Sequence, residues 1–233
     1  MRATILALTL LASAGAWAYS GRPPVGYAGA PPQSLTCAAC HVPATGSPHI
    51  PNLGDGALSV VGFPPSYKIG GPVVTVTVEL RDPDQARWGF LLVAVGTRMR
   101  PGGTLSLPGY PMQRYVKLIP DATAGWNYGG NTRDGTYWSY DPPDLGGPVE
   151  WNLLWKPPAE HAVGDIMVYV SAVAADGHNG PGIENFLPGP LGDDSYATSL
   201  KIKGPPPTSG DLSGDGEITW LDYFLFALQW QGP

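Results

Sequence analysis

Cys37 and Cys40 are the two cysteines of this chain, and His41 directly follows the second of them. In a Cys-x-x-Cys-His motif, two thiols can add to the two vinyl groups on one edge of a porphyrin, and the histidine then lies below the ring as an iron ligand. The spacing therefore predicts a covalent haem c site with His41 as proximal ligand. Random placement of two cysteines and four histidines would give this arrangement in about one of several thousand chains.

Two other uses of the motif stay open. A disulfide between Cys37 and Cys40 would form a small redox loop, although thioredoxin-like motifs open a helix in a βαβ unit and no such pattern surrounds this pair. Two thiolates and an imidazole could also begin a zinc site. Structural zinc takes four protein ligands, however, and the sequence has no second Cys-x-x-Cys pair and no His-x-x-x-His pair.

The redox role of such a haem depends on its sixth iron ligand. Methionine raises the potential, a second histidine lowers it, and an open position permits ligand binding. Met112 and His49 are the leading candidates, because both occur in proline-containing loop sequences that could fold over a haem. An empty sixth position is equally consistent with the sequence. The further candidates are Met99, Met167, His161 and His178, of which Met167 is expected to pack within a strand.

A second group of oxygen donors lies near the C-terminus. They occupy loop positions 1, 3, 5, 9 and 12, with Gly216 at position 6: Asp211, Ser213, Asp215, Thr219 and Asp222. Calcium takes about six to eight oxygen ligands, and a glycine at this position permits the sharp turn that makes them converge. Glu217 would add its main-chain carbonyl, and Thr219 would ligate directly or through water. The loop therefore predicts a calcium site, with a solvated acidic turn as the plainer alternative.

Hydrophobic periodicity indicates the elements that must position these groups. Alternate residues from Val74 to Leu80 share one face of a predicted strand at 73–80, and the continuous apolar run 88–95 fits a central strand buried on both faces. The alternation recurs at 149–155, 166–172 and 196–200. About seven short strands separated by turn residues predict an all-β, immunoglobulin-like β-sandwich.

Several sequence motifs follow one another in a recognisable order. They are Tyr19-Ser20, Ala28-Gly29-Ala30-Pro31, the haem motif, Tyr67-Lys68-Ile69-Gly70-Gly71, the segment RWGFLLVA from Arg87, Trp151 with Trp155-Lys156-Pro157-Pro158, and VYVSAVAADG from Val168. In this order the chain resembles the Reelin (reeler) domain over residues 19–202. It is most similar to bacterial secreted relatives that have been called choice-of-anchor domains. The resemblance implies a Reelin-type sandwich. Animal reeler domains are disulfide-bonded, whereas both cysteines here belong to the haem motif, so core packing must hold this sandwich.

The calcium loop has a resemblance of its own. Asp222 stands where an EF-hand has a bidentate glutamate, no entering helix precedes the loop, and residues 223–228 continue it as an apolar segment. These features resemble a single type I dockerin repeat. Dockerins that bind cohesin normally contain two repeats, so a calcium-folded surface tag fits equally well. The apolar run 220–230 predicts a short helix that cannot cross a bilayer and needs a protein partner or the sandwich as a covering surface.

The N-terminus and the composition indicate an exported protein. Met1-Arg2, an apolar run and Ala16-Trp17-Ala18 predict a signal peptide over residues 1–18, with an uncleaved anchor as the alternative. The later sequence lacks the ~18 consecutive apolar residues that a membrane span needs. The 32 glycines and 27 prolines are best explained as turns, because 43% of the residues are hydrophobic and eight are Trp. The net charge of -6, about -7 without Arg2, argues against nucleic acid or anionic membranes as partners.

These features divide the chain into five parts. They are the signal peptide 1–18, a Pro/Gly-rich segment 19–56 with the haem motif, a Reelin-like sandwich 57–203, a linker 204–210 and the dockerin-like calcium repeat 211–233. We expect export to the periplasm, cell surface or medium of a bacterium.

Two functions are compatible with these features. The leading hypothesis is an exported monohaem c-type cytochrome-like protein for electron transfer or redox sensing, with an unidentified redox partner. The alternative is a secreted adhesion, matrix or polysaccharide-associated binding protein whose dockerin-like tail binds a protein or cell-surface partner. An enzyme is less favoured, because no catalytic motif stands out and both Asp193-Asp194 and 141–144 are interpreted as solvated turns. Peroxidase-like chemistry at an open haem stays open.

Overall fold

A computed structural model describes residues 23–43, 49–137, 148–159, 163–176, 192–205, 210–213 and 218–229. The described chain forms nine strands, four 3₁₀ turns and one α-helix. The strands are β1 (Ala57–Val61), β2 (Val74–Arg81), β3 (Arg87–Gly96), β4 (Thr104–Ser106), β5 (Val116–Asp121), β6 (Trp126–Asn131), β7 (Val149–Lys156), β8 (Ile166–Ala175) and β9 (Asp194–Ile202). The turns are η1 (Cys37–Ala39), η2 (Thr97–Met99), η3 (Met112–Arg114) and η4 (Asp134–Tyr137), and the helix is α1 (Trp220–Gln229).

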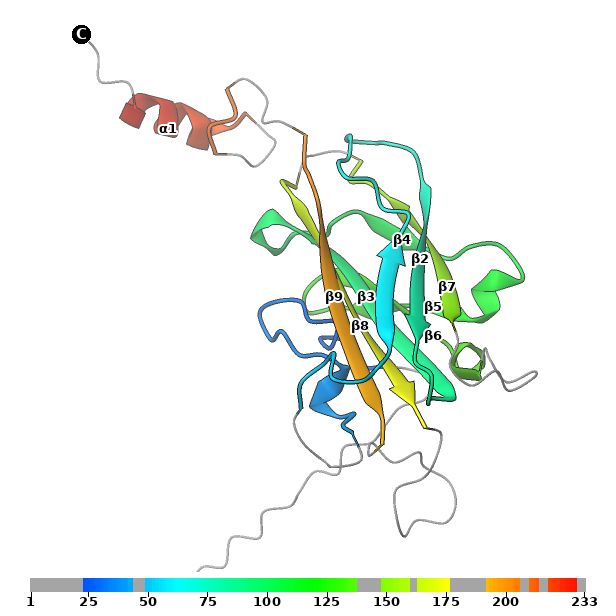
Figure 1. Cartoon of the computed structure of the whole chain (residues 1–233). Coiled ribbons are helices and arrows are strands. Elements are labelled where there is room, and N and C mark those ends of the chain that lie inside the picture. The colour runs from blue at the N-terminus through cyan, green and yellow to red at the C-terminus, as the bar shows by residue number, and fades with distance from the viewer. Residues whose placement is uncertain are drawn as a thin grey trace, which may run out of the picture.

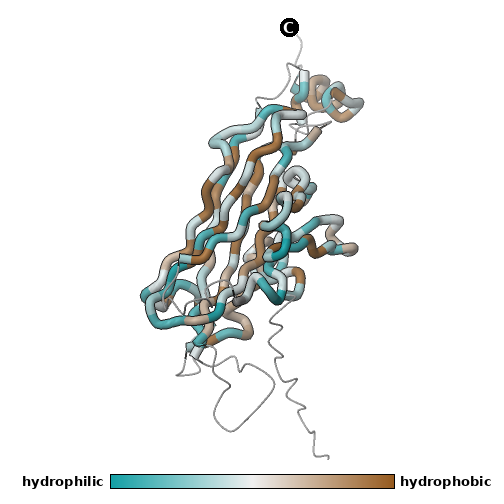
Figure 2. Tube along the Cα trace, turned by 90° about the vertical axis from the view of Figure 1, so that its right-hand side faces the viewer, coloured by the Kyte–Doolittle hydropathy of each residue, from teal (hydrophilic) through white to brown (hydrophobic). Residues whose placement is uncertain are grey.

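Two antiparallel sheets pack face to face. One has the order β1-β2-β7-β4 and the other β5-β6-β3-β8-β9, and Figure 1 shows them as two layers. Between them lies the main core, in which the rings of Phe90 and Trp151 meet at 4.7 Å. Hydrophobic residues recur along the strands in Figure 2. The predicted all-β sandwich is thus confirmed.

The strands predicted from periodicity are present. β2 begins at Val74, one residue later than predicted, and its inward residues Val76, Val78 and Leu80 are fully buried. β3 is a central strand of its sheet, buried along nearly its whole length as the continuous apolar run predicts. β7, β8 and β9 contain the other three predicted runs and extend beyond them by one, three and four residues in total.

Four strands, β1, β4, β5 and β6, are not among the five predicted runs, and the last two have a clear physical reason. β5 contains Pro120, which is tolerated because β5 is an edge strand. β6 contains Gly129 and Gly130, which carry no side chain to mark an alternating pattern. A Cβ at Gly129 would lie 2.2 Å from Leu153 Cδ1 on the opposite sheet. A glycine is therefore needed there for the two sheets to approach closely.

The segment before β1 covers the outer face of the five-stranded sheet. Alternate residues of β3 point to this face, and Leu91, Val93 and Val95 pack there with Ala28 and Ala30 in a second hydrophobic cluster. The cluster fixes the N-terminal segment against β3. It thereby sets the position of η1, which begins at Cys37 and is followed directly by Cys40.

Helix α1 lies beyond the end of β9, whereas the N-terminal segment lies near the other end of the sandwich (Figure 1). Most of its large apolar side chains are exposed, with Trp220 at 77% and Tyr223 at 72%. None of the helices in the described residues is both long enough and apolar enough to span a membrane. The predicted signal peptide lies outside the described residues.

Candidate functional site

The Cys-x-x-Cys-His motif folds into one tight turn against β8. Within it the N–H groups of Cys40 and His41 both donate to the Cys37 carbonyl, at 3.1 and 2.9 Å. The Cys37 N–H donates to Ser171 Oγ of β8 at 2.8 Å. Both thiols and the imidazole are therefore carried by a single turn whose start is tied to the sheet.

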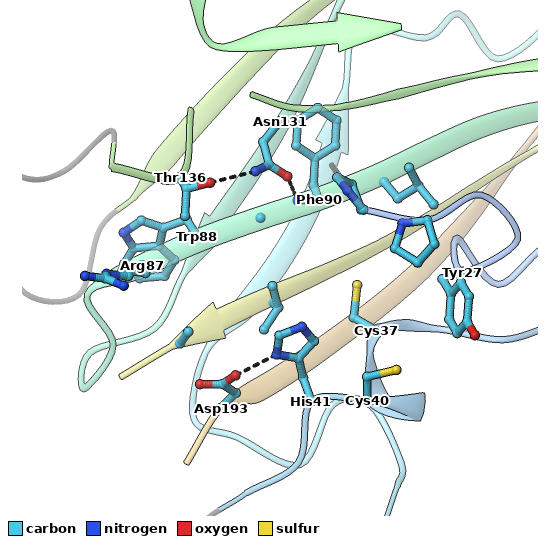
Figure 3. A pocket seen from close by; sticks show the side chains of 16 residues that line it. Tyr27, Cys37, Cys40, His41, Arg87, Trp88, Phe90, Asn131, Thr136 and Asp193 are labelled. Carbon is cyan, nitrogen blue, oxygen red and sulfur yellow. Dashed lines mark hydrogen bonds and ion pairs between the residues drawn. The ribbon is translucent and has the colours of Figure 1, made fainter. Parts of the chain in front are cut away.

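An open pocket lies beside this turn, with an empty volume of about 870 Å³ that includes its mouth. Cys37, Cys40 and His41 line one side, and Figure 3 shows them together. The other lining residues are Pro23, Pro24, Tyr27, Arg87, Trp88, Gly89, Phe90, Leu91, Asn131, Thr136, Val173, Ala175 and Asp193. Most of this lining is apolar, as a site for a large aromatic group requires.

The pocket extends along the outer face of β3 and β8. Cys37 is tied to Ser171, while Arg87 pairs in register with Ala175, four residues further along β8. Four strand residues span ~13 Å. Between these ends β3 presents Gly89, where a Cβ would lie 3.2 Å from both Asn131 Oδ1 and Val173 Cγ1. Asn131 and Val173 therefore lie close over Gly89, and a larger residue at this position would crowd them.

His41 is held by a buried carboxylate that sequence reasoning missed. Its Nδ1 lies 2.6 Å from Asp193 Oδ2, and the side chains are 20% and 3% exposed. The interpretation of Asp193 as part of a solvated turn is therefore wrong. No local signal marks the contact, because the two residues are 152 positions apart and only the fold brings them together. Burial raises the pKa of Asp193, while the hydrogen bond from His41 opposes that rise.

The Cys37 thiol does not have the lowered pKa of a reactive nucleophile. Cys37 and Cys40 are both free cysteines, and burial raises the pKa of Cys37 to about 11, against the lowering effect of Ser171. Catalytic disulfide motifs need a lowered thiol pKa, because the thiolate is the nucleophile. In the described part of the chain, no three His, Cys, Asp or Glu side chains form a group that could hold a metal ion. The disulfide-exchange and zinc alternatives therefore gain no support.

The predicted sixth ligands do not line the pocket. His49 is exposed and pairs through Nδ1 with the Ala38 carbonyl at 3.0 Å, so it lies against η1. Met112 begins η3, just before β5. Of the described lining residues, His41 is the one imidazole and none is a methionine. Met99 and Met167 lie in η2 and β8. His161 and His178 lie outside the described residues.

Asp194, next to the His41 partner, is half-buried and lies against a buried polar group. Tyr196 Oη donates to Asp82 Oδ2 at 2.6 Å, and Gln85 Nε2 donates to Asp194 Oδ2 at 3.3 Å. Burial, and then the neighbouring Asp82, raise the pKa of Asp194. Asp194 is therefore also not the solvated turn residue that was predicted.

Asp194→Asn is expected to change how folding stability depends on pH. A folded-state pKa above the unfolded value means that Asp194 favours folding below the unfolded pKa of about 4 and loses this contribution as the pH rises through the folded pKa. Asparagine has no proton to lose. Relative to wild type, the variant should therefore gain stability as the pH is raised from about 4. Urea unfolding across this range measures the difference, and a constant difference would contradict the expectation.

The C-terminal loop brings together four of the six predicted calcium ligands. Ser213 donates from its N–H to Asp222 Oδ1 at 2.8 Å and from its Oγ to Asp211 Oδ1 at 3.2 Å. Thr219 N–H donates to Asp222 Oδ2 at 2.6 Å. These main-chain donors lower the pKa of Asp222 to about 2. Asp215 and Glu217 lie outside the described residues.

The contacts of this loop also explain how α1 begins. Asp222 accepts from the Thr219 N–H, and Thr219 Oγ1 accepts from the Leu221 N–H at 3.3 Å. This reciprocal pattern is similar to a capping box, which satisfies donors at a helix start. Carboxylate oxygens have further lone pairs, so the same groups can still ligate a cation.

Comparison with known proteins finds distant structural likenesses only. The human F-spondin reeler domain is 15% identical, with a TM-score of 0.38 over 70% of this chain and 95% of that one. AvmM, which catalyses macrocyclization in alchivemycin A biosynthesis, is 13% identical, with a TM-score of 0.34 over 66% and 92% of the two chains. The type II cohesin A11 from Bacteroides cellulosolvens is 12% identical, with a TM-score of 0.29 over 64% and 98%. No family model matches the sequence, and no curated protein matches it. At these TM-scores the fold class rests on the two sheets themselves.

Proposed function

We propose that this chain is an exported haem c protein that transfers or senses single electrons, with the β-sandwich as its scaffold. The observation that carries the proposal is the turn of Cys37, Cys40 and His41 at the side of an apolar pocket. A c-type haem supplies one-electron redox chemistry when it is bound. Cys37 and Cys40 would attach it, and His41 would ligate its iron.

The residues present fit such a group. Haem c needs two thiols on one turn and an imidazole whose Nε2 is available, and here Asp193 engages Nδ1 and leaves the other ring nitrogen to the pocket (Figure 3). Gly89, which lines the pocket, adds no side chain to it. Arg87 lies on the other side of His41 from the cysteines, which suits the propionates, because these are on the porphyrin edge opposite the vinyl groups.

A pyridine haemochrome spectrum tests this proposal. The full chain is produced with and without the haem c maturation machinery, denatured, and freed of non-covalent pigment. The proposal predicts a haem c spectrum, at one haem per chain, with the machinery and none without it. Protein that stays colourless under both conditions would contradict it.

The C-terminal loop is proposed to bind one calcium ion through Asp211, Ser213, Asp215, Glu217, Thr219 and Asp222. Support comes from the convergence of Asp211, Ser213 and Asp222 and from the spacing of the other donors. The resemblance of this loop to a dockerin repeat makes it a candidate surface tag.

Asp215→Asn is expected to weaken calcium binding by about tenfold or more, because affinity follows the charge of the ligand set. Isothermal titration of the full chain with calcium measures this, and wild type should take up one ion per chain. Asp134→Asn is the matched control, since Asp134 pairs with Arg114 at an exposed site in η4. Equal affinities in all three proteins, or no binding to wild type, would contradict the assignment.

A second candidate function, binding of a protein or cell-surface partner, has support from α1. Its aromatic residues Trp220, Tyr223, Phe224 and Phe226 are all more than half exposed, and a group of exposed apolar side chains is typical of an interaction site. In this reading the haem site is auxiliary, and loss of haem would leave partner binding intact.

A further inference from the structure

The pairing of His41 with Asp193 goes beyond haem attachment. Attachment needs only the two thiols, and iron ligation needs only Nε2 of the imidazole. The carboxylate of Asp193 is 3% exposed and lies 2.6 Å from the remaining ring nitrogen, Nδ1. A carboxylate this deeply buried is costly unless it has a defined partner.

The main chain holds both partners in place. The N–H groups of Gly192 and Asp193 both donate to the Val42 carbonyl, at 3.0 and 3.1 Å. Ser195 Oγ donates to the His41 carbonyl at 3.0 Å. Hydrogen bonds before and after Asp193 therefore join the chain at His41 and Val42 to the start of β9. They keep the Asp193 carboxylate aligned with the His41 imidazole.

This arrangement has a defined effect on the imidazole. With its proton on Nδ1 and donated to Asp193, the ring presents the Nε2 lone pair to the pocket. A carboxylate acceptor increases the basicity of a ligating histidine more than a neutral carbonyl does, and it adds negative charge near the metal. Both effects favour the more highly charged, oxidised metal.

We propose that Asp193 is a positioning residue that fixes the His41 tautomer and gives the bound haem a low reduction potential. This inference rests on the proposed haem function. It places the protein with low-potential electron carriers or with haems that react with small oxidants, rather than with high-potential carriers.

The test compares Asp193→Asn with wild type as matured full-length protein. Asparagine keeps the shape and a carbonyl acceptor but removes the charge. We expect the covalent haem content, measured by intact mass, to be unchanged. The reduction potential should rise by about 59 mV. This is the one-electron equivalent of a tenfold change in an equilibrium constant, and tenfold is the lower end of the effects that such outer partners have on metal affinity. Asp194→Asn is the matched control, because it removes an adjacent carboxyl that does not contact His41. The reduction potential of this control should shift clearly less than that of Asp193→Asn.

A shift in Asp193→Asn no larger than in Asp194→Asn would overturn this inference and leave haem binding intact, whereas wild type without covalent haem would overturn both. Should Asp193→Asn fail to fold, the tautomer of His41 in the wild-type chain without haem tests whether Asp193 fixes it. Two-dimensional ¹H–¹⁵N NMR should show Nδ1 protonated and Nε2 bare. The opposite tautomer would refute the assignment.

Discussion

Serine at both Cys37 and Cys40 is expected to abolish covalent haem. The thioether bonds need the two sulfur atoms, and the sequence contains no other cysteine that could replace them. Serine keeps the size and the tight turn but cannot form the bonds. The double variant should therefore fold and show the mass of the unmodified chain, with no haem c spectrum after denaturation.

The single variants provide the internal control. Each keeps one sulfur, so each should retain haem through one bond and in lower yield. Circular dichroism should show the β-sandwich in all three variants, because the sandwich core does not include the cysteines. Full haem content in the double variant would show that haem is held by other means.

Among the substitutions proposed for this protein, Trp151→Ala should cause the largest loss of folding stability. Trp151 is 1% exposed, packs on Phe90 across the two sheets and donates from Nε1 to the Gly135 carbonyl at 3.2 Å. Large-to-small changes at such positions cost about 3–5 kcal/mol, which is much of the ~5–15 kcal/mol that stabilises a typical domain. Urea unfolding of the haem-free chain measures the free energy of unfolding.

Trp220→Ala is the matched control for that measurement. Trp220 is 77% exposed at the start of α1, so its loss should change the free energy of unfolding by less than about 0.5 kcal/mol. Similar costs for the two tryptophans would mean that the packing between the sheets does not dominate stability.

Local periodicity was sufficient to predict most of the sandwich. An alternating strand such as β7, or a fully apolar one such as β3, carries its burial pattern in consecutive residues. β6 was missed because Gly129 and Gly130 have no side chains to alternate. The need for glycine there comes from Leu153 on the opposite sheet, which is a long-range contact.

The candidate site also has one part that the local sequence could predict and one part that depends on long-range contacts. The motif itself is local, so Cys37, Cys40 and His41 could be predicted from their spacing alone. Asp193 could not, because its role depends on β9 beginning beside the motif turn. The candidates Met112 and His49 were chosen as loop residues, and position along the chain does not determine which loops border the pocket.

Covalent haem on the motif can be measured by intact mass and peptide mapping of the purified chain, produced with haem c maturation machinery. Covalent attachment should add the mass of one haem, located on the peptide that contains Cys37 and Cys40. An unmodified chain, with the two thiols free to react with an alkylating reagent or joined in a disulfide, would contradict the haem c proposal.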